Sequence, residues 1–401
     1  MSSHFYDLLK YKKTGIANPN MTSYDKVKAH ALCGGSIPIN TITGEPPLTF
    51  RSDGSALTAW SISGNMAQSG TPTPSSPIQP QECGDKTANL AIVSAESLLT
   101  YSGSYNNFTL DTVSQTITTT GNALLGFVVA VEPSTQYTVN ASCTKAGCFI
   151  RVREYSSRPT AWAGAEYIQQ TFSEYIGAAR SFTTTASTTY IAVAFYADDT
   201  KVGAEISEIM LNTGGTAMDY VHGGYAVPVT VGNQTQTIYL MEPIRQIDEY
   251  TDVAASDNTV TRLIATFDLA KLTWSYFTGS NYAIFWALVD RQLIERCKGY
   301  SNAFEVTTVA AFSSMPDNSL RVYEGSNRQQ RLAIRYDAAE GSVSALKDML
   351  TQNSAMAWLV MEEPETEQYN APTISTAKGS NTLAIGTTLQ PSSVSITGHI
   401  E

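Results

Sequence analysis

The stretch TYIAVAFYA, residues 189–197, decides the fold class, because its side chains alternate strictly between two kinds. Ile191, Val193 and Phe195 are large and apolar, whereas the residues between them are tyrosine or alanine. A period of two residues is typical of a β-strand with two distinct faces. We therefore expect a strand here, with its large apolar side chains turned toward a core.

Further strand-like stretches surround this one at regular spacing between residues 89 and 221. They are FTLDTVSQTITTT, ALLGFVVAV, TQYTVNASCT, FIRVREY, SFTTT and AEISEIMLN. About eight strands separated by Gly, Asn and Ser-Thr turns are typical of a two-layer β fold. The sequence therefore predicts a central jelly-roll β-sandwich over residues 88–221.

Residues 222–401 predict a C-terminal β-rich domain with one short helix. The domain opens with the hairpin YAVPVTVGNQTQTIYL, in which Gly232-Asn233 is a strong two-residue turn signal. The helix is predicted at SVSALKDMLTQN, where Val343, Leu346 and Leu350 share one face. The remaining expected strands are TRLIATFDL, LTWSYFT, AIFWALV, AFEVTTVAAF, MAWLVMEE and the tail TLAIGTTLQPSSVSITGHI.

Two stretches precede the predicted sandwich. Residues 34–87 combine short strands, PLTFRSD and ALTAWSIS, with a connector in which prolines recur every two or three residues. Residues 1–33 carry a local basic excess and an apolar group formed by Phe5, Tyr6, Leu8, Leu9 and Tyr11. This segment is too short for a core of its own, so it either docks on a partner or folds back on the sandwich.

Composition and charge exclude several classes of function. The chain has 401 residues, with 36 acidic against 25 basic side chains and a net charge of −11, and no Lys/Arg stripe that could neutralise phosphates. Nucleic-acid binding is therefore disfavoured. No window supplies about 18 uninterrupted apolar residues, so we expect no membrane insertion. The five cysteines are an odd number on a long chain and are interpreted as mostly reduced thiols.

The sequence offers no convincing catalytic or metal-binding group. Its four histidines lie in turns or termini, outside any nucleophile or metal motif. The acidic run EEPETE, residues 362–367, is interpreted as a solvated loop, whereas a catalytic acid pair needs partial burial. Asp198, Asp199 and Asp219 are too few oxygen ligands for calcium. We expect no catalytic residue, no metal and no cofactor.

Binding is the chemistry that remains. Five aromatic residues fall in a weakly patterned stretch between two predicted strands, where they could stack on sugar rings: Tyr155, Trp162, Tyr167, Phe172 and Tyr175. The alternative is that they plug the end of the sandwich or pack on a neighbouring subunit. A second aromatic group, in WSYFTGSNYAIFW, lies in strand-like sequence and is interpreted as core.

Several phrases, taken in order, resemble structural proteins of phages and prophages of Gram-positive gut bacteria, of the tail, baseplate or fibre type. GNMAQSGTPTPSSPIQPQECGDKTANL is similar to a segment that leads into the carbohydrate-binding-module-like jelly roll of these proteins. EPSTQYTVNAS and ISEIMLNTGGTAMDYV are similar to strands of that jelly roll. The other matching phrases are YAVPVTV with QTIYLMEPIRQI, SALKDMLTQNSAMAWLVMEEPETE and NTLAIGTTLQPSSVSI. Together they cover most of residues 60–396, whereas residues 1–33 have no counterpart.

The resemblance implies a virion location and a non-enzymatic structural role. The expected function is that of a tail or baseplate fibre or adhesin that contributes to host-surface attachment. A head fibre or capsid-decoration protein is one alternative, and a glycan depolymerase is another. Expected partners are other virion proteins, bound through residues 1–33, host cell-surface glycan, and further copies of the chain in a homotrimer, which would cover exposed strand edges.

Overall fold

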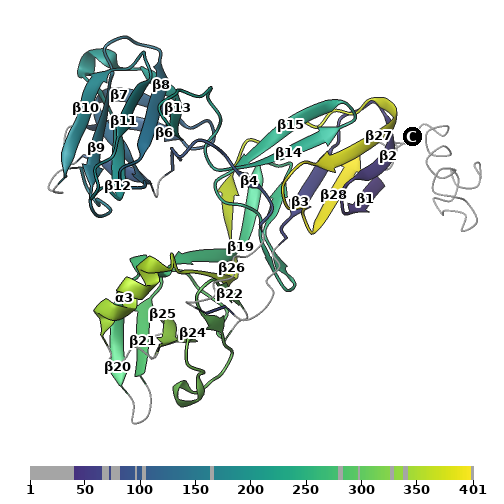
Figure 1. The fold of residues 1–401 in the computed structure, drawn as a ribbon. Helices are drawn as coiled ribbons and strands as arrows, with labels where there is room; N and C mark the ends of the chain where they lie inside the picture. Colours follow the sequence, from purple (N-terminus) through teal and green to yellow (C-terminus); the bar gives the residue numbers. More distant parts are fainter. Residues whose placement is uncertain are drawn as a thin grey trace, which may run out of the picture. The chain divides into compact units, whose positions relative to one another are not determined.

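The computed structural model describes residues 40–65, 72–73, 82–94, 97–101, 105–162, 167–278, 283–296, 299–325, 329–336 and 342–398. In these ranges the chain is mainly β, with several sheets and one α-helix (Figure 1), which confirms the predicted fold class. None of the helices described there is long and apolar enough to span a membrane. The predicted anchor, residues 1–33, and most of the proline-rich connector lie outside the described residues.

The chain divides into two compact units. The sandwich unit comprises Asp85–Ala226 and Tyr239–Glu242, and the composite unit comprises Met1–Gly84, Val227–Ile238 and Pro243–Glu401. The sequence pattern predicted residues 34–87 and 222–401 as separate regions. That division does not hold for residues 40–65, because their strands pair with strands from the C-terminal half of the chain. Such long-range pairing leaves no mark on local sequence patterns.

A seven-stranded antiparallel sheet of the composite unit combines strands from residues 40–63 with strands from residues 253–398. Its order is β1 (Asn40–Gly44), β28 (Ser393–Gly398), β3 (Ala59–Ser63), β18 (Val253–Ala255), β19 (Thr259–Asp268), β26 (Met356–Gln368) and β22 (Gly299–Ser301). β28 lies between the two N-terminal strands, with Ile396 opposite both Ile42 and Trp60. Trp60 and Ile396 are buried, so this pairing contributes apolar packing as well as backbone hydrogen bonds.

The predicted hairpin belongs to another sheet. The order of that sheet is β15 (Gln234–Leu240), β14 (Tyr225–Val231), β27 (Lys378–Ile385) and β2 (Leu48–Asp53), while β4 (Asp85–Lys86) pairs with the first residues of β14. Gly232 in the hairpin turn has φ +60°, a left-handed conformation that glycine adopts without strain. A short ladder is formed by β16 (Gln246–Ile247) and β17 (Tyr250–Thr251).

A five-stranded sheet and the helix form the third part of the composite unit. The sheet order is β20 (Trp274–Thr278), β21 (Ala283–Leu288), β25 (Gln330–Arg335), β24 (Ser319–Glu324) and β23 (Glu305–Val306). Helix α3 (Val343–Gln352) begins after Ser342, whose hydroxyl accepts a hydrogen bond from the Ala345 backbone amide. Leu346 and Leu350 are fully buried, as the predicted apolar face requires. Short 3-10 turns are η2 (Leu269–Lys271) and η3 (Phe312–Ser314).

The sandwich unit is built from β5 (Leu98–Thr100), β6 (Asn106–Asp111), β7 (Thr116–Ala130), β8 (Gln136–Cys143), β9 (Phe149–Tyr155), β10 (Gln169–Tyr175), β11 (Arg180–Thr183), β12 (Tyr190–Ala197), η1 (Asp199–Lys201) and β13 (Glu205–Thr213). The first half of β7 pairs with β6 and β13, and its second half pairs with β5 and β12. Strand β7 therefore belongs to two layers, β6-β7-β13-β8-β11 and β5-β7-β12-β9-β10.

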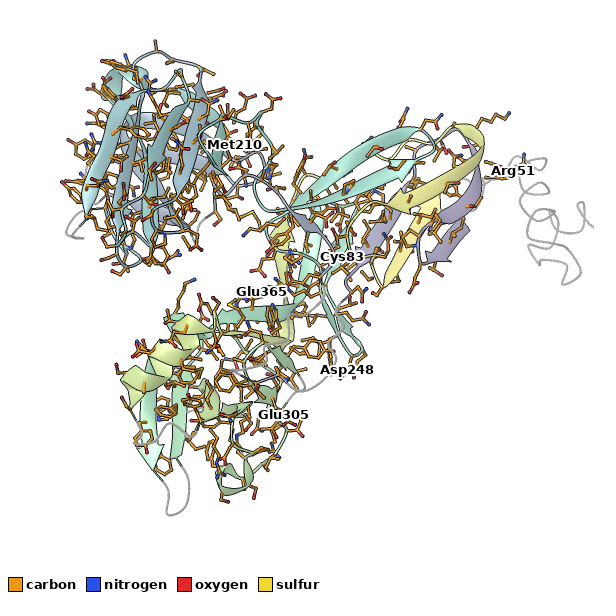
Figure 2. All side chains as sticks on the ribbon, viewed as in Figure 1. Arg51, Cys83, Met210, Asp248, Glu305 and Glu365 are labelled. Carbon is orange, nitrogen blue, oxygen red and sulfur yellow. The ribbon has the colours of Figure 1, made fainter. Side chains whose placement is uncertain are left out.

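One apolar core fills the space between these two layers. It includes Ile117, Val139 and Ile206 from one layer, and Phe127 and Phe195 from the other. Each of these side chains is almost fully buried. The side chains drawn in Figure 2 fill this interior densely, and the labelled Met210 on β13 is buried as well. Burial of this much apolar surface is the main stabilising contribution for the unit.

The structure corrects three details of the strand prediction. The stretches TITTT and ALLGFVVAV are one continuous strand, β7, although its register against β6 shifts around Gly121-Asn122. In AFEVTTVAAF only Glu305–Val306 is strand. The run EEPETE is the exposed second half of β26 rather than a loop, and Glu365 (Figure 2) lies in it.

A buried charged network lies in the composite unit. Asp252 and Arg262 are almost fully buried, and Arg262 Nη1 lies 3.2 Å from Asp252 Oδ2 while Nη2 lies 3.1 Å from Glu367 Oε2. Arg245 pairs with Glu82 at 2.5 Å. Burial raises the pKa of the Asp252 carboxyl, an effect that Arg262 opposes. Charges this deep need every one of these partners, because an unpaired buried charge is strongly destabilising.

Candidate functional site

The outward face of the layer β5-β7-β12-β9-β10 is the candidate site. In β12, Ile191, Val193 and Phe195 point into the core, as their sequence pattern predicted. The alternate residues of the same strand therefore face away from the core. The pairing register places Tyr196 of β12 opposite Phe149 of β9, and Phe149 opposite Tyr175 of β10. One row of outward positions thus carries an aromatic residue on three adjacent strands.

Two more tyrosines extend this row on its β5 side. Tyr105 lies 6.3 Å from Tyr196 between ring centroids, and Tyr101 lies 5.2 Å from Tyr105 with nearly perpendicular rings. On the other side, Phe149 lies 6.1 Å from Tyr196 and 4.2 Å from Tyr175. We call the five residues Tyr101, Tyr105, Tyr196, Phe149 and Tyr175 the aromatic belt.

The aromatic belt remains accessible along its length. Tyr175 is 61% exposed, and the other four rings are partly exposed. Large aromatic side chains tend to be buried, and a continuous exposed row of them is typical of a surface that binds something. Ring faces in a strip can stack on flat, partly apolar groups such as sugar rings.

Two arginines occupy the next outward positions on β9. The Nε of Arg151 donates to the Ser173 hydroxyl at 3.2 Å. Burial, and next the charge of Arg153, lower the pKa of Arg151 from its ordinary value. The guanidinium of Arg153 lies between two rings, 4.2 Å from the Trp162 centroid and 4.4 Å from that of Tyr167. The belt is therefore flanked by positive charge in a chain whose net charge is −11.

The centre of this face is covered by the chain itself. Gly126, Ala192 and Ala194 leave room above the sheet, and a Cβ on Gly126 would lie 3.2 Å from that of Ala194. Trp162 and Tyr155 pack into this space and are 3% and 1% exposed. The belt at the edge of the covered region is thus the accessible aromatic surface.

The five aromatic residues predicted from the sequence fall into different environments. Tyr155 and Trp162 are buried, and Phe172 packs against the sandwich core. Tyr167 and Tyr175 are exposed, at 45% and 61%, and only Tyr175 belongs to the belt. Phe172 and Tyr175 lie in β10, a strand that the weak pattern did not reveal, in part because of the bulge between Gln170 and Phe172.

The other four belt residues were not among the predicted site residues. Tyr196 and Phe149 were assigned to strands, but only the register between β12 and β9 shows that they adjoin. Tyr101 and Tyr105 flank a segment without a strand pattern. One sequence feature could have indicated the belt. In TYIAVAFYA the alternation places tyrosines on the outward face of the strand.

Glu154 is a buried carboxylate at one end of the sandwich, and its partners are hydrogen-bond donors. It accepts hydrogen bonds from Thr171 Oγ1 at 2.6 Å, Thr188 Oγ1 at 2.5 Å, Gln169 Nε2 at 2.8 Å and the Thr185 amide at 2.9 Å. Burial raises its pKa, but these hydrogen bonds outweigh burial, so the net pKa is lowered. A carboxylate held in its ionised form is a poor proton donor, so Glu154 is unsuited to act as a general acid.

We expect Glu154 to make the thermal stability of the sandwich unit depend on pH. Because the folded pKa of Glu154 is lowered, its contribution is complete above the ordinary glutamate pKa of about 4.3 and is lost as the pH falls from there through the lower folded pKa. Scanning calorimetry should show that Glu154→Gln melts at a lower temperature near neutral pH, and that this difference shrinks on acidification. Glu132→Gln, at an exposed site, should keep the wild-type profile. A difference that is constant with pH would contradict the assignment.

His222, Cys143 and Cys148 are chemically reactive residue types, and their contacts are with other parts of the fold. Both ring nitrogens of His222 lie within 3.0 Å of backbone carbonyl oxygens, of Gly223 and Val113. Cys143 and Cys148 flank the β8-β9 turn as free thiols, and burial raises the pKa of Cys148 to about 12. In the part of the chain that the structure describes, no cluster of three or more His, Cys, Asp or Glu residues is placed to hold a metal ion.

Comparison of the chain with protein-family models, with curated proteins and with solved structures gives no significant match.

Proposed function

We propose that this chain is a non-catalytic attachment protein of a virion, and that its sandwich unit binds host-surface glycan through the aromatic belt. The belt carries the proposal, because a row of five partly or fully exposed rings on a β-sandwich offers several neighbouring surfaces on which sugar rings can stack. Arg151 and Arg153 beside it add hydrogen-bond donors for hydroxyl or acidic oxygens.

The virion location rests on the ordered sequence resemblance to phage tail, baseplate and fibre proteins. A head fibre or capsid-decoration protein would use the same modules and remains the alternative. Residues 1–33, with Phe5, Tyr6, Leu8, Leu9 and Tyr11, are proposed as the attachment to other virion proteins, on the basis of their composition alone. Assembly of the chain as a homotrimer is likewise part of the proposal.

Cell-wall binding without hydrolysis is the expected result for the purified full-length chain. The measurement is co-sedimentation with cell walls isolated from Gram-positive gut bacteria, with release of reducing ends followed in the same samples. Saturable binding with no release of reducing ends supports the proposal. Release of reducing ends that is abolished by replacing one carboxylate would instead favour a depolymerase, and the absence of binding to any wall would overturn glycan attachment.

A further inference from the structure

A cleft of about 420 Å³ lies on the five-stranded sheet of the composite unit, whereas the aromatic belt belongs to the sandwich unit. This volume falls within the range of small-molecule sites, roughly 300–1,000 Å³. The pairing register brings two of its lining residues close together, since Trp286 of β21 and Arg321 of β24 both pair with Ala333 of β25. Ala333 itself is fully buried against Ile284 and Met315, and Trp286 and Arg321 flank it on the two neighbouring strands.

Aromatic rings form the walls of this cleft. Trp286 stands on one side, and on the other Phe312 of η3 meets Tyr323 edge to face, with 5.0 Å between ring centroids. The sequence interpretation of Trp286 as core is wrong for a simple reason. Phe285 points into the core of the unit, so its neighbour along the strand must lie on the opposite face.

Two arginines line the cleft, and each has one buried N–H without an acceptor in the part of the chain that the structure describes. Arg321 is 5% exposed, and its guanidinium lies 3.9 Å from the Phe312 centroid, with Nη1 donating to backbone carbonyls of residues 309 and 310. Arg331 lies 4.5 Å from the Trp286 centroid. The Nε–H groups of both arginines are buried, and among the described residues neither has a hydrogen-bond acceptor. A buried N–H without an acceptor is costly, so a ligand oxygen here would relieve a penalty.

Two carboxylates complete the lining. Glu295 and Glu324 are both exposed and lie at the cleft, and Glu295 also pairs with Arg296 at 3.5 Å. The site thus combines rings for stacking, buried cationic donors and exposed acceptors. Arginine suits carboxylate and phosphate groups, aromatic faces suit the apolar face of a sugar ring, and carboxylates accept hydrogen bonds from its hydroxyls.

We propose that this cleft is a second binding site, which takes a sugar ring bearing a carboxylate or phosphate group. The ring stacks on Trp286, the acidic group accepts hydrogen bonds from Arg331 and Arg321, and the hydroxyls face Glu295 and Glu324. The site is independent of the aromatic belt, and it stands whether or not the belt binds glycan.

Calorimetric titration of the full-length chain tests the site with four probes: glucuronate, glucose 6-phosphate, glucose and inorganic phosphate. At least one of the two acidic sugars should bind saturably with a dissociation constant on the order of 1 mM, about −4 kcal/mol. Glucose and phosphate should bind at least about tenfold more weakly, since each lacks one half of the recognised chemistry. Which acidic sugar binds better identifies the acidic group that the cleft prefers.

Variants locate the binding. Arg331→Gln should weaken it at least about tenfold, since a charge-assisted hydrogen bond is lost. Trp286→Leu, which keeps an apolar wall but no ring, provides a second variant. Arg291→Gln removes a surface arginine paired with Glu365 and should bind like the wild type. The proposal is overturned if neither acidic sugar binds, if glucose binds equally well, or if both cleft variants bind normally.

Discussion

Asp252→Ala is expected to lower the free energy of unfolding of the composite unit by about 3–5 kcal/mol, the range for removing one partner of a buried ion pair. Asp252 is completely buried, and its carboxylate has four donors. Oδ1 accepts from the backbone amides of Leu263 and Ile264 at 2.8 and 3.1 Å, and Oδ2 accepts from the Arg245 amide and from Arg262.

The bulge in β19 explains why this loss should be large. Pairing of β19 with β26 shifts between Arg262 and Ile264, and the Asp252 carboxylate accepts the amides at this irregularity. Alanine would leave these buried donors, and part of the Arg262 charge, without partners. Burial raises the pKa of the Asp252 carboxyl, so the attraction of Arg262 does not fully offset the cost of burying the charge. The measured loss of stability therefore reports the hydrogen-bond donors that are left without an acceptor, rather than a favourable ion pair.

Urea unfolding followed by circular dichroism provides the measurement. Asp252→Asn should lie between alanine and the wild type, because its amide keeps an acceptor for Leu263 but turns a donor toward Arg262. Asp317→Ala removes the exposed partner of Arg335 and should change stability by less than about 0.5 kcal/mol. If Asp252→Ala lowers the free energy of unfolding no more than Asp317→Ala does, the charged network does not stabilise the bulge.

Tyr175→Ala is expected to weaken binding of the full-length chain to cell-wall glycan about thirtyfold, corresponding to about 2 kcal/mol for an aromatic hot spot. Tyr175 is the most exposed ring of the belt, and its main contact is Phe149 at 4.2 Å. Its loss should therefore leave the fold intact while removing the end of the stacking surface. Tyr196→Ala, in the middle of the belt, should have at least as large an effect on binding.

Co-sedimentation with isolated cell walls over a range of protein concentrations measures these affinities. Tyr276→Ala is the matched control, since Tyr276 is an exposed tyrosine, 39% accessible, on β20 of the composite unit. It should bind as the wild type does. Equal affinity of the Tyr175, Tyr196 and Tyr276 variants would remove the belt from the site, even if the chain binds glycan elsewhere.

Local chemistry made several elements predictable. The two-residue alternation of TYIAVAFYA, the Gly-Asn turn and the apolar face of the helix each depend on residues close together in the sequence, and all three are present. The candidate site was less predictable. Among the five aromatic residues predicted from the sequence, only Tyr175 lies in the belt, because burial of Tyr155 and Trp162 depends on small residues from other strands.

By itself the sequence determined that this chain is mainly β, where most of its strands and its helix lie, and that its charge is acidic. Tertiary structure decided which outward residues meet. The belt gathers residues on three paired strands with Tyr101 and Tyr105 beside them, and the cleft gathers Trp286, Arg321 and Phe312 from three separate elements. The physical reason is that alternation assigns a side chain to a face, whereas register between strands, set by the whole fold, assigns its neighbours.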